Sequence, residues 1–340
     1  MENKGKICIL HIGGPKTGST SLQKFLFKNR ANLNREGWAY PDVNIRGYGH
    51  HDLAFLLGGG YPQWASKLTL SLEDISRSLV DCLKTKSRVI ISSENFYLLP
   101  DPERLAGLID MAGFSPGSIK VVVYIRRQDE AHVSWYNQAV KAQGYTGTIL
   151  ESVDENRLLW NYAARLDDWA KVFGHAHLIV RPYQDGDLAG GDTRHDFLQI
   201  VGLSPEKFEW TAEPVNTRIN RDLLEFQRIL NGLPVSTEKK RLFHKKFIEL
   251  SRLTEGTELF SQAPLMTEKQ RYEVFCSYEA SNSRVASKYL GRDVLFKFKP
   301  DPCKDDHGYD GLKIEKIAAI IGWLLIQDKG EGEDGGKVQL

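Results

Sequence analysis

The sequence predicts an α/β fold of three layers, in which a central, mainly parallel β-sheet is flanked by helices and followed by a helical C-terminal part. Two observations lead to this prediction. Up to about residue 195, apolar runs of strand length alternate with segments of helical period, which is the pattern of a parallel sheet with helices on both faces. From about residue 196 onwards, helical periods prevail.

Four apolar runs are predicted to form the sheet, and a short strand is expected near "WAYP" at 38–41. The four runs are 8–12, 88–94, 119–126 and 175–183. The first three contain few polar positions, which is typical of strands covered on both faces. Helices are expected between and after the strands, at 21–33, 71–84, 102–113, 129–143, 157–174, 195–203, 220–232, 239–253 and 266–290. Ser19 or Thr20 is expected to cap the first of these helices.

With 340 residues the chain is long enough to bury a substantial core. We expect a single domain over 1–298, made of a core at about 7–220 and a helical part at about 221–298. Residues 299–340 are predicted to form a turn-rich linker, a helix at 312–327 and a disordered tail. The apolar stripe of that helix can pack on the body or on a partner chain, so a homo-oligomer through this helix is possible.

The composition excludes several classes of protein. Lys+Arg 45 against Asp+Glu 44 leaves a net charge of +1, so wholesale binding of nucleic acid or of an anionic membrane is not expected. Four widely spaced cysteines (Cys8, Cys82, Cys276 and Cys303) indicate free thiols in a reducing compartment. The short apolar run near the N-terminus leads directly into the glycine loop, so we expect a buried strand there and not a signal peptide, and no apolar run approaches the roughly 20 residues that span a bilayer. We therefore expect a cytoplasmic protein that is not integral to a membrane.

A glycine-rich loop follows the first predicted strand. Gly13 and Gly18 have the separation of a nucleotide-triphosphate loop, but Ser19 stands where that loop has its lysine, and Lys16 lies two places before the second glycine. A strand, a glycine turn and a helix N-terminus together present backbone N–H groups and a positive helix end to an anion. The strand at 119–126 ends in arginines, where the Walker-B strand of such proteins ends in the acidic residues that hold Mg²⁺. This argues against a magnesium-triphosphate site.

Two motifs resemble those of the sulfotransferases that use 3′-phosphoadenosine 5′-phosphosulfate (PAPS). "PKTGSTSLQKFL" at 15–26 is similar to their 5′-phosphosulfate loop, P-K-[TS]-G-[TS]-[TS]-x-L. "RRQDEAHVSWY" at 126–136 is similar to their 3′-phosphate motif, R-x-P-x-x-x-x-x-S-x-Y. Arg126, Ser134 and Tyr136 match that motif, and Gln128 replaces its proline.

The likeness extends over roughly residues 7 to 220. Tyr162, Leu166, Trp169 and Phe173 fit the family's Y-x-x-x-L-x-x-W-x-x-x-F segment, and the stretch at 195–203 fits the helix that follows. The resemblance implies a P-loop-type fold, PAPS as donor, adenosine 3′,5′-bisphosphate (PAP) as product, and no metal. It implies that the nucleotide is bound by Pro15, Lys16, Thr17, Gly18, Ser19, Thr20, Ser21, Arg126 and Ser134, with Arg218 as a weaker candidate.

Elementary chemistry agrees with these assignments. Arg126 leaves the carboxyl end of a parallel strand, which is the edge where ligands bind in such sheets. A guanidinium group can make paired hydrogen bonds to a phosphate. Transfer of a neutral SO₃ unit develops charge on the bridging oxygen and the leaving phosphate, and Lys16 can stabilise that charge without a metal.

The attacking hydroxyl needs a base within hydrogen-bonding reach. The resembling family commonly has a His or Glu in the loop after the first helix, where "GYGHHDLAFLL" at 47–57 offers His50 and His51, and imidazole titrates near neutral pH. Glu94, at the end of the strand at 88–94, is a second candidate, either as the base or as a group that orients a histidine. Spacing does not choose between the two histidines.

The sequence therefore predicts a sulfotransferase acting on a hydroxyl of a carbohydrate or glycolipid, with the acceptor class resting on the resemblance alone. Two alternatives stay open. A nucleotide or small-molecule kinase would turn over ATP with Mg²⁺. A non-catalytic nucleotide-binding module would bind PAP without sulfating an acceptor.

Overall fold

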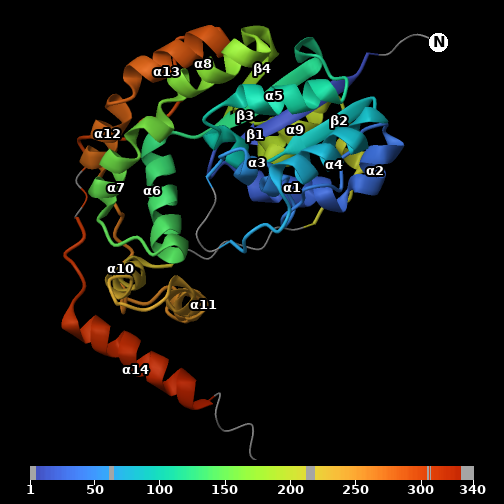
Figure 1. Ribbon diagram of the computed structural model, residues 1–340. Helices are drawn as coiled ribbons and strands as arrows, with labels where there is room; N and C mark the ends of the chain where they lie inside the picture. Colours follow the sequence, from blue (N-terminus) through green and yellow to red (C-terminus); the bar gives the residue numbers. More distant parts are fainter. Residues whose placement is uncertain (1–4, 61–64, 212–218, 305, 307, 331–340) are drawn as a thin grey trace, which may run out of the picture. The chain divides into compact units, whose positions relative to one another are not determined.

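The protein is described by a computed structural model that covers residues 5–60, 65–211, 219–304, 306 and 308–330 (Figure 1). The chain forms two compact units. The first comprises Met1–Ala131, Asn156–Glu213 and Tyr272–Pro300, and the second comprises His132–Glu155, Pro214–Arg271 and Asp301–Leu340. The division into one domain over 1–298 and a separate tail stays a prediction.

The first unit contains a four-stranded parallel sheet, as the apolar runs predict. Its strands are β1 (Ile7–Gly13), β2 (Arg88–Ser92), β3 (Ile119–Ile125) and β4 (Leu178–Pro182), in the order β2-β1-β3-β4. Segment 38–41 adds a single bridge, because the N–H of Ala39 donates to the carbonyl of Arg88 at 2.9 Å and the carbonyl of Ala39 accepts from Ile90 at 2.8 Å. The three-layer α/β prediction is thereby confirmed.

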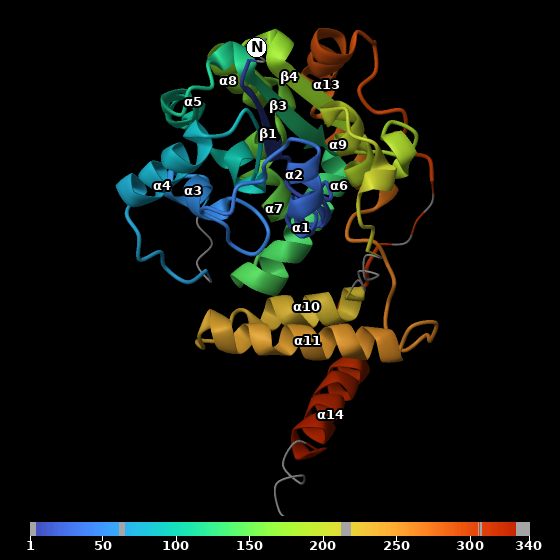
Figure 2. The same cartoon turned by 90° about the vertical axis from the view of Figure 1, so that its right-hand side faces the viewer.

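Helices cover both faces of this sheet (Figure 2). α1 (Ser19–Lys28), α2 (Arg30–Arg35) and α9 (Thr193–Val201) lie on one face, where Phe25 and Phe197 join Ile9 and Tyr124 in the core. α5 (Pro102–Met111) and α8 (Tyr162–Phe173) lie on the other face and contact each other. The remaining helices of this unit include α3 (His51–Leu56), α4 (Leu72–Lys84) and α13 (Glu279–Val285), with a 3₁₀ turn, η1, at Glu94–Leu98.

The helix expected at 21–33 is in fact two helices, because Asn29 interrupts it. The Nδ2 of Asn29 donates to the carbonyl of Phe25 at 3.1 Å and to that of Glu209 at 2.9 Å. Its Oδ1 accepts from the N–H of Glu209 at 2.8 Å. A buried side chain that satisfies a distant backbone segment ends α1, and local propensity could not predict this.

The second unit is helical. It contains α7 (Ile149–Glu155), α10 (Arg221–Leu230), α11 (Thr237–Leu253) and α14 (Ile314–Gly330). α6 (Gln128–Gln138) and α12 (Glu268–Cys276) run across the boundary between the units. The buried carboxylate of Asp222 in α10 accepts from the N–H of Ser261 at 2.5 Å, from Tyr309 at 2.6 Å and from Lys316 at 2.5 Å. These contacts attach the segment before α14, and the start of α14, to α10.

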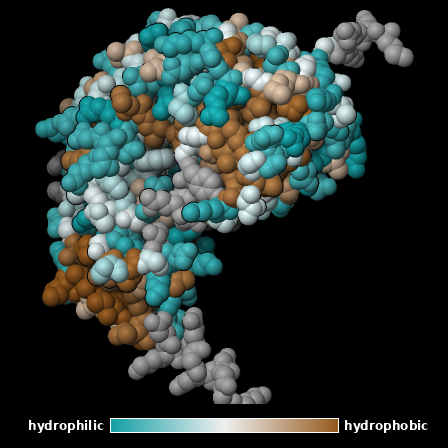
Figure 3. All heavy atoms as spheres, viewed as in Figure 1, coloured by the Kyte–Doolittle hydropathy of each residue, from teal (hydrophilic) through white to brown (hydrophobic). Residues whose placement is uncertain are grey.

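α14 lies where the sequence predicts a C-terminal helix, and it exposes apolar side chains. Ile314 is 75% exposed, Leu325 60% and Ile326 69%, and Figure 3 shows apolar side chains gathered over this helix. Assembly of copies through α14 stays a prediction. Among the described residues, no helix combines the length and the apolar character needed to cross a membrane.

Candidate active site

The glycine loop after β1 is held against the neighbouring strand. Gly14 has φ +109°, and a Cβ placed on it would lie 1.8 Å from the carbonyl oxygen of Tyr124 in β3. Thr17 closes the turn, because its Oγ1 donates to the carbonyl of Gly14 at 2.6 Å. Lys16 adopts φ 69°, a left-handed conformation that is unusual outside glycine. The loop is thus a tight, strained turn at the carboxyl edge of the sheet.

The N-terminus of α1 carries no side-chain cap. Its N-cap residue is Gly18, with φ 80° and no capping hydrogen bond, so the expected cap by Ser19 or Thr20 is wrong. Ser19 lies inside the helix instead, and its buried Oγ has no hydrogen-bond partner among the residues that the structure describes. Thr20 is exposed and Ser21 is half-buried. An uncapped helix end beside an unpaired buried hydroxyl is well suited to an anion.

Arg126 lies directly after β3 and reaches the loop. Its Nη1 donates to the carbonyl of Lys16 at 3.3 Å, and its Nε pairs with Glu130 at 2.9 Å. The hydroxyl of the buried Tyr162 donates to the carbonyl of Arg126 and accepts from its N–H. Two segments more than a hundred residues apart are therefore joined at the edge where ligands of parallel sheets bind.

Lys16 sits in a mixed electrostatic environment. Burial lowers the pKa of its ammonium group below the ordinary value, the charge of Glu94 opposes this effect, and the charge of Arg126 adds to it. Glu94 begins η1, immediately after the Ser93 that follows β2. It lies close to the loop, because a Cβ on Gly13 would come within 2.5 Å of the Cα of Glu94. Lys16, Glu94 and Arg126 thus belong to one cluster.

The two adjacent histidines have different environments. His50 is fully buried, its Nε2 lies 3.1 Å from the carbonyl of Pro41, and its Nδ1 accepts from the N–H of Ser92 at 3.2 Å. Burial lowers its pKa to about 4. Both ring nitrogens are occupied by backbone groups, so His50 anchors the loop to β2.

His51 begins α3 and is only half-buried. Its Nδ1 hydrogen-bonds to the Oγ of Ser93 at 2.8 Å. Its pKa is lowered, chiefly by burial, while the charge of Glu94 raises it. Of the two histidines, His51 is the one whose ring is accessible and influenced by Glu94.

A cavity of about 730 Å³ opens beside the loop, a size typical of small-molecule sites. The start of α1 (Gly18 and Ser21), the end of β3 (Arg126) and the segments after β4 and before α9 line it. Its full lining is Gly18, Ser21, Arg126, Arg127, Glu130, Tyr183, Gln184, Asp185, Gly186, Leu188, Gly191, Asp192, Thr193 and Phe298. All these residues belong to the first unit.

Two other predicted nucleotide-binding residues, Ser134 and Arg218, stay predictions. Ser134 lies half-buried in α6, in the second unit, and its pairing with Arg126 stays a prediction. Arg218 lies outside the described residues. Gln128, where the resembling motif has proline, is buried at the start of α6, and its Nε2 donates to the Oδ1 of Asn282 at 2.6 Å. The Oε1 of Gln128 in turn accepts from the Nδ2 of Asn282 at 3.1 Å. A pair of amide hydrogen bonds to α13 therefore forms at the position where the resembling motif has proline.

Sequence reasoning missed most of the cavity lining, and three of the missed residues contact Arg126 or the glycine loop. Tyr183 follows β4 directly, and its ring centroid lies 5.8 Å from the guanidinium carbon of Arg126. Thr193, at the start of α9, places its Oγ1 3.4 Å from the carbonyl of Thr17. Glu130 pairs with Arg126. Two signals were available in the sequence: Tyr183 follows a strand at its carboxyl end, and Glu130 lies four residues after Arg126. Thr193 depends on a tertiary contact.

Comparisons with known proteins give weak likenesses. No protein-family model matches the chain. An uncharacterized protein of Archaeoglobus fulgidus is 29% identical over 203 residues, which are 59% of this chain and 54% of that protein, so the match spans about half the length of that relative.

Two solved structures are also similar in part. One is a sulfotransferase from Alicyclobacillus acidocaldarius, with a TM-score of 0.41 and 16% identity over 72% of this chain and 96% of that one. The other is retinol dehydratase in complex with androsterone and inactive cofactor PAP, with a TM-score of 0.28 and 13% identity over 98% of this chain and 82% of that one. Likenesses of this strength assign no activity to the chain.

Proposed function

We propose that the protein is a sulfotransferase that moves the sulfuryl group of PAPS to an acceptor hydroxyl. The observation that carries the proposal is the meeting of Lys16 and Arg126 beside the uncapped N-terminus of α1, next to a cavity large enough for a nucleotide. One residue of each motif that resembles the PAPS-binding ones therefore lies at this edge of the sheet. The unpaired Oγ of Ser19 fits the same ligand, since a phosphate oxygen would satisfy it.

The donor would lie across the carboxyl edge of the sheet. Loop N–H groups and the hydroxyls of Ser19, Thr20 and Ser21 would bind the 5′-phosphosulfate, and Pro15, Thr17 and Gly18 would shape the turn. Arg126, with Ser134, would bind the 3′-phosphate. Tyr183 offers a ring on which the base can stack. Arg218 stays an additional candidate.

Lys16 would act where charge develops. As the acceptor oxygen bonds to sulfur, the bond from sulfur to the bridging oxygen breaks, and PAP leaves with the electron pair of that bond. The ammonium group of Lys16 would stabilise this leaving phosphate. Glu94 helps to keep Lys16 protonated against the effect of burial.

His51 would take the proton of the acceptor hydroxyl, with Glu94 as the alternative base or as the group that stabilises the imidazolium. His50 is the weaker candidate, because its ring nitrogens face backbone groups in the core. A carbohydrate or glycolipid is the proposed acceptor, on the resemblance of the motifs. A cytoplasmic location is proposed on the four free cysteines, which are typical of a reducing compartment.

Binding of PAP tests the proposal against its alternatives. In isothermal titration calorimetry, PAP is expected to bind more tightly than ATP with Mg²⁺, and Arg126→Ala is expected to weaken PAP binding by about tenfold or more. The matched control is Arg77→Ala, which removes an exposed arginine that pairs with Glu73. Tighter binding of ATP, together with no effect of Arg126→Ala, would favour the kinase. PAP binding without incorporation of labelled sulfate into any glycan would favour the non-catalytic module.

The pH dependence of turnover tests His51. A base must be neutral to accept a proton, and burial lowers the pKa of His51 below its ordinary value. Activity is therefore expected to persist as the pH falls through 6.5, and to be lost only at lower pH as His51 becomes protonated. His51→Gln is expected to lower kcat about 10²-fold or more and to abolish this acid limb. His175→Gln, at an exposed site, serves as the control. An unchanged acid limb in His51→Gln would transfer the role to Glu94.

A further inference from the structure

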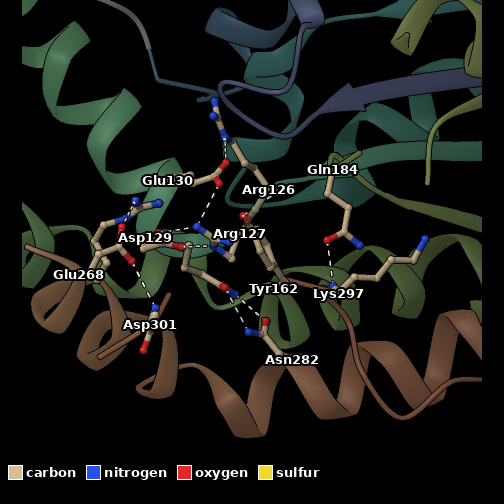
Figure 4. A network of polar contacts seen from close by, with 12 residues as sticks. Arg126, Arg127, Asp129, Glu130, Tyr162, Gln184, Glu268, Asn282, Lys297 and Asp301 are labelled. Atoms are coloured by element: carbon tan, nitrogen blue, oxygen red, sulfur yellow. Dashed lines mark hydrogen bonds and ion pairs between the residues drawn. The ribbon is translucent and has the colours of Figure 1, made fainter. Parts of the chain in front are cut away.

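A carboxylate occupies the wall of the proposed anion site. Glu130, in the first turn of α6, lines the cavity together with Arg126 and Arg127. Its Oε2 lies 2.9 Å from the Nε of Arg126, and its Oε1 lies 3.1 Å from the Nη2 of Arg127 (Figure 4). Each oxygen of Glu130 thus pairs with a different arginine.

The two arginines differ in their ion pairs with carboxylates. Arg127 also pairs with Asp129, which is fully buried, through hydrogen bonds of 2.6 Å and 3.1 Å. A buried carboxylate needs such a partner, so the pairing of Arg127 with Asp129 is structural. Glu130 is 32% exposed at its side chain and Arg126 23%. Their pairing is therefore accessible to water and weaker, and it can be broken without leaving a buried charge unpaired.

We infer that Glu130 is an internal competitor of the ligand's terminal phosphate. Glu130 pairs with the Nε of Arg126, and the 3′-phosphate of the nucleotide must displace Glu130 to form its own hydrogen bonds there. The carboxylate also repels the phosphate directly, since like charges in one site disfavour each other. Glu130 thereby lowers the affinity for PAP and PAPS and favours product release. This inference rests on the proposed function.

If Glu130 only positioned Arg126, removal of its charge would change the nucleotide affinity in the opposite direction. If its carboxylate served to aim the guanidinium of Arg126, removal of the charge would misplace Arg126 and weaken nucleotide binding. If it competes, removal of the charge strengthens binding. The direction of the change in affinity therefore separates the two roles.

Calorimetric titration of Glu130→Gln with PAP and with adenosine 5′-monophosphate (AMP) provides the test. Glutamine keeps the size of the side chain and removes its charge. We expect the Kd for PAP to fall about five- to tenfold, because the substitution releases Arg126 from a partly exposed ion pair and removes a charge that repels the phosphate. The Kd for AMP, which lacks the 3′-phosphate, is expected to stay within about twofold of the wild-type value. Glu103→Gln, which removes an exposed carboxylate in α5, is the control.

A double variant completes the test. With Arg126→Ala already present, Glu130→Gln is expected to add less to PAP affinity, because competition for the guanidinium requires Arg126 and only the direct repulsion remains. An unchanged or increased Kd for PAP in Glu130→Gln, with PAP binding to the wild type intact, overturns the inference and leaves the proposed function standing. A gain of equal size for AMP also overturns it. Absence of PAP binding to the wild type refutes the proposed function, and this inference with it.

Discussion

Replacement of Lys16 by alanine is expected to lower kcat for sulfuryl transfer by about 10²- to 10³-fold, as for other preorganised groups that stabilise developing charge. The ammonium group lies in a partly buried cluster with Glu94 and Arg126, where an electrostatic interaction is stronger than in water. Because charge on the leaving phosphate grows as the bond breaks, the loss should fall mainly on kcat. The Kd for PAP is expected to rise by only about tenfold or less.

Steady-state kinetics with a labelled donor, together with calorimetry with PAP, measure both quantities. Lys86→Ala removes an exposed lysine far from the loop in sequence and is expected to leave both unchanged. A rise in the Kd for PAP as large as the fall in kcat would mean that Lys16 binds the ground state and the transition state equally. Full activity of Lys16→Ala would remove it from the mechanism.

Replacement of Gly14 by alanine is expected to lower the free energy of unfolding by about 3 kcal/mol. A Cβ at this position would lie 1.8 Å from the carbonyl oxygen of Tyr124, a backbone atom of the central strand β3 that cannot rotate away. The φ of +109° adds the strain that any L side chain meets in this region. PAP binding should be lost as well, because the loop must move away from β3 and from Arg126.

Chemical denaturation with urea measures the stability change, and calorimetry on the folded fraction measures binding. Gly117→Ala is a matched control, since a Cβ there would meet nothing within 4 Å. A loss of less than about 1 kcal/mol in Gly14→Ala would show that the loop can shift away from Tyr124 at little cost.

The pattern of apolar runs was sufficient to predict the sheet. β1, β2 and β3 are covered on both faces, so their sequences are nearly continuous apolar runs, and this signal is local. The motif around Lys16 was also visible, because glycine is needed where the chain turns tightly and approaches another strand. The end of α1 was not predictable, since Asn29 ends that helix through hydrogen bonds to Glu209.

The two candidate histidines show what the sequence could not predict. His50 and His51 are neighbours in the sequence, and no local property separates them. Their environments differ because Ser92 and Pro41 supply backbone partners to His50, whereas Glu94 lies close enough to His51 to influence its titration. Ser92 and Glu94 come from a segment distant in the sequence from the two histidines.

By itself, then, the sequence determined the order of strands and helices, the glycine turn and the arginine at the end of β3, because each depends on residues close together in the chain. Only the tertiary structure decided which side chains share the site. It brought Arg126 to the carbonyl of Lys16, Thr193 to the carbonyl of Thr17, and Tyr183 to the cavity wall. The physical reason is that electrostatic and hydrogen-bonding partners are set by the packing of distant strands, which no local pattern encodes.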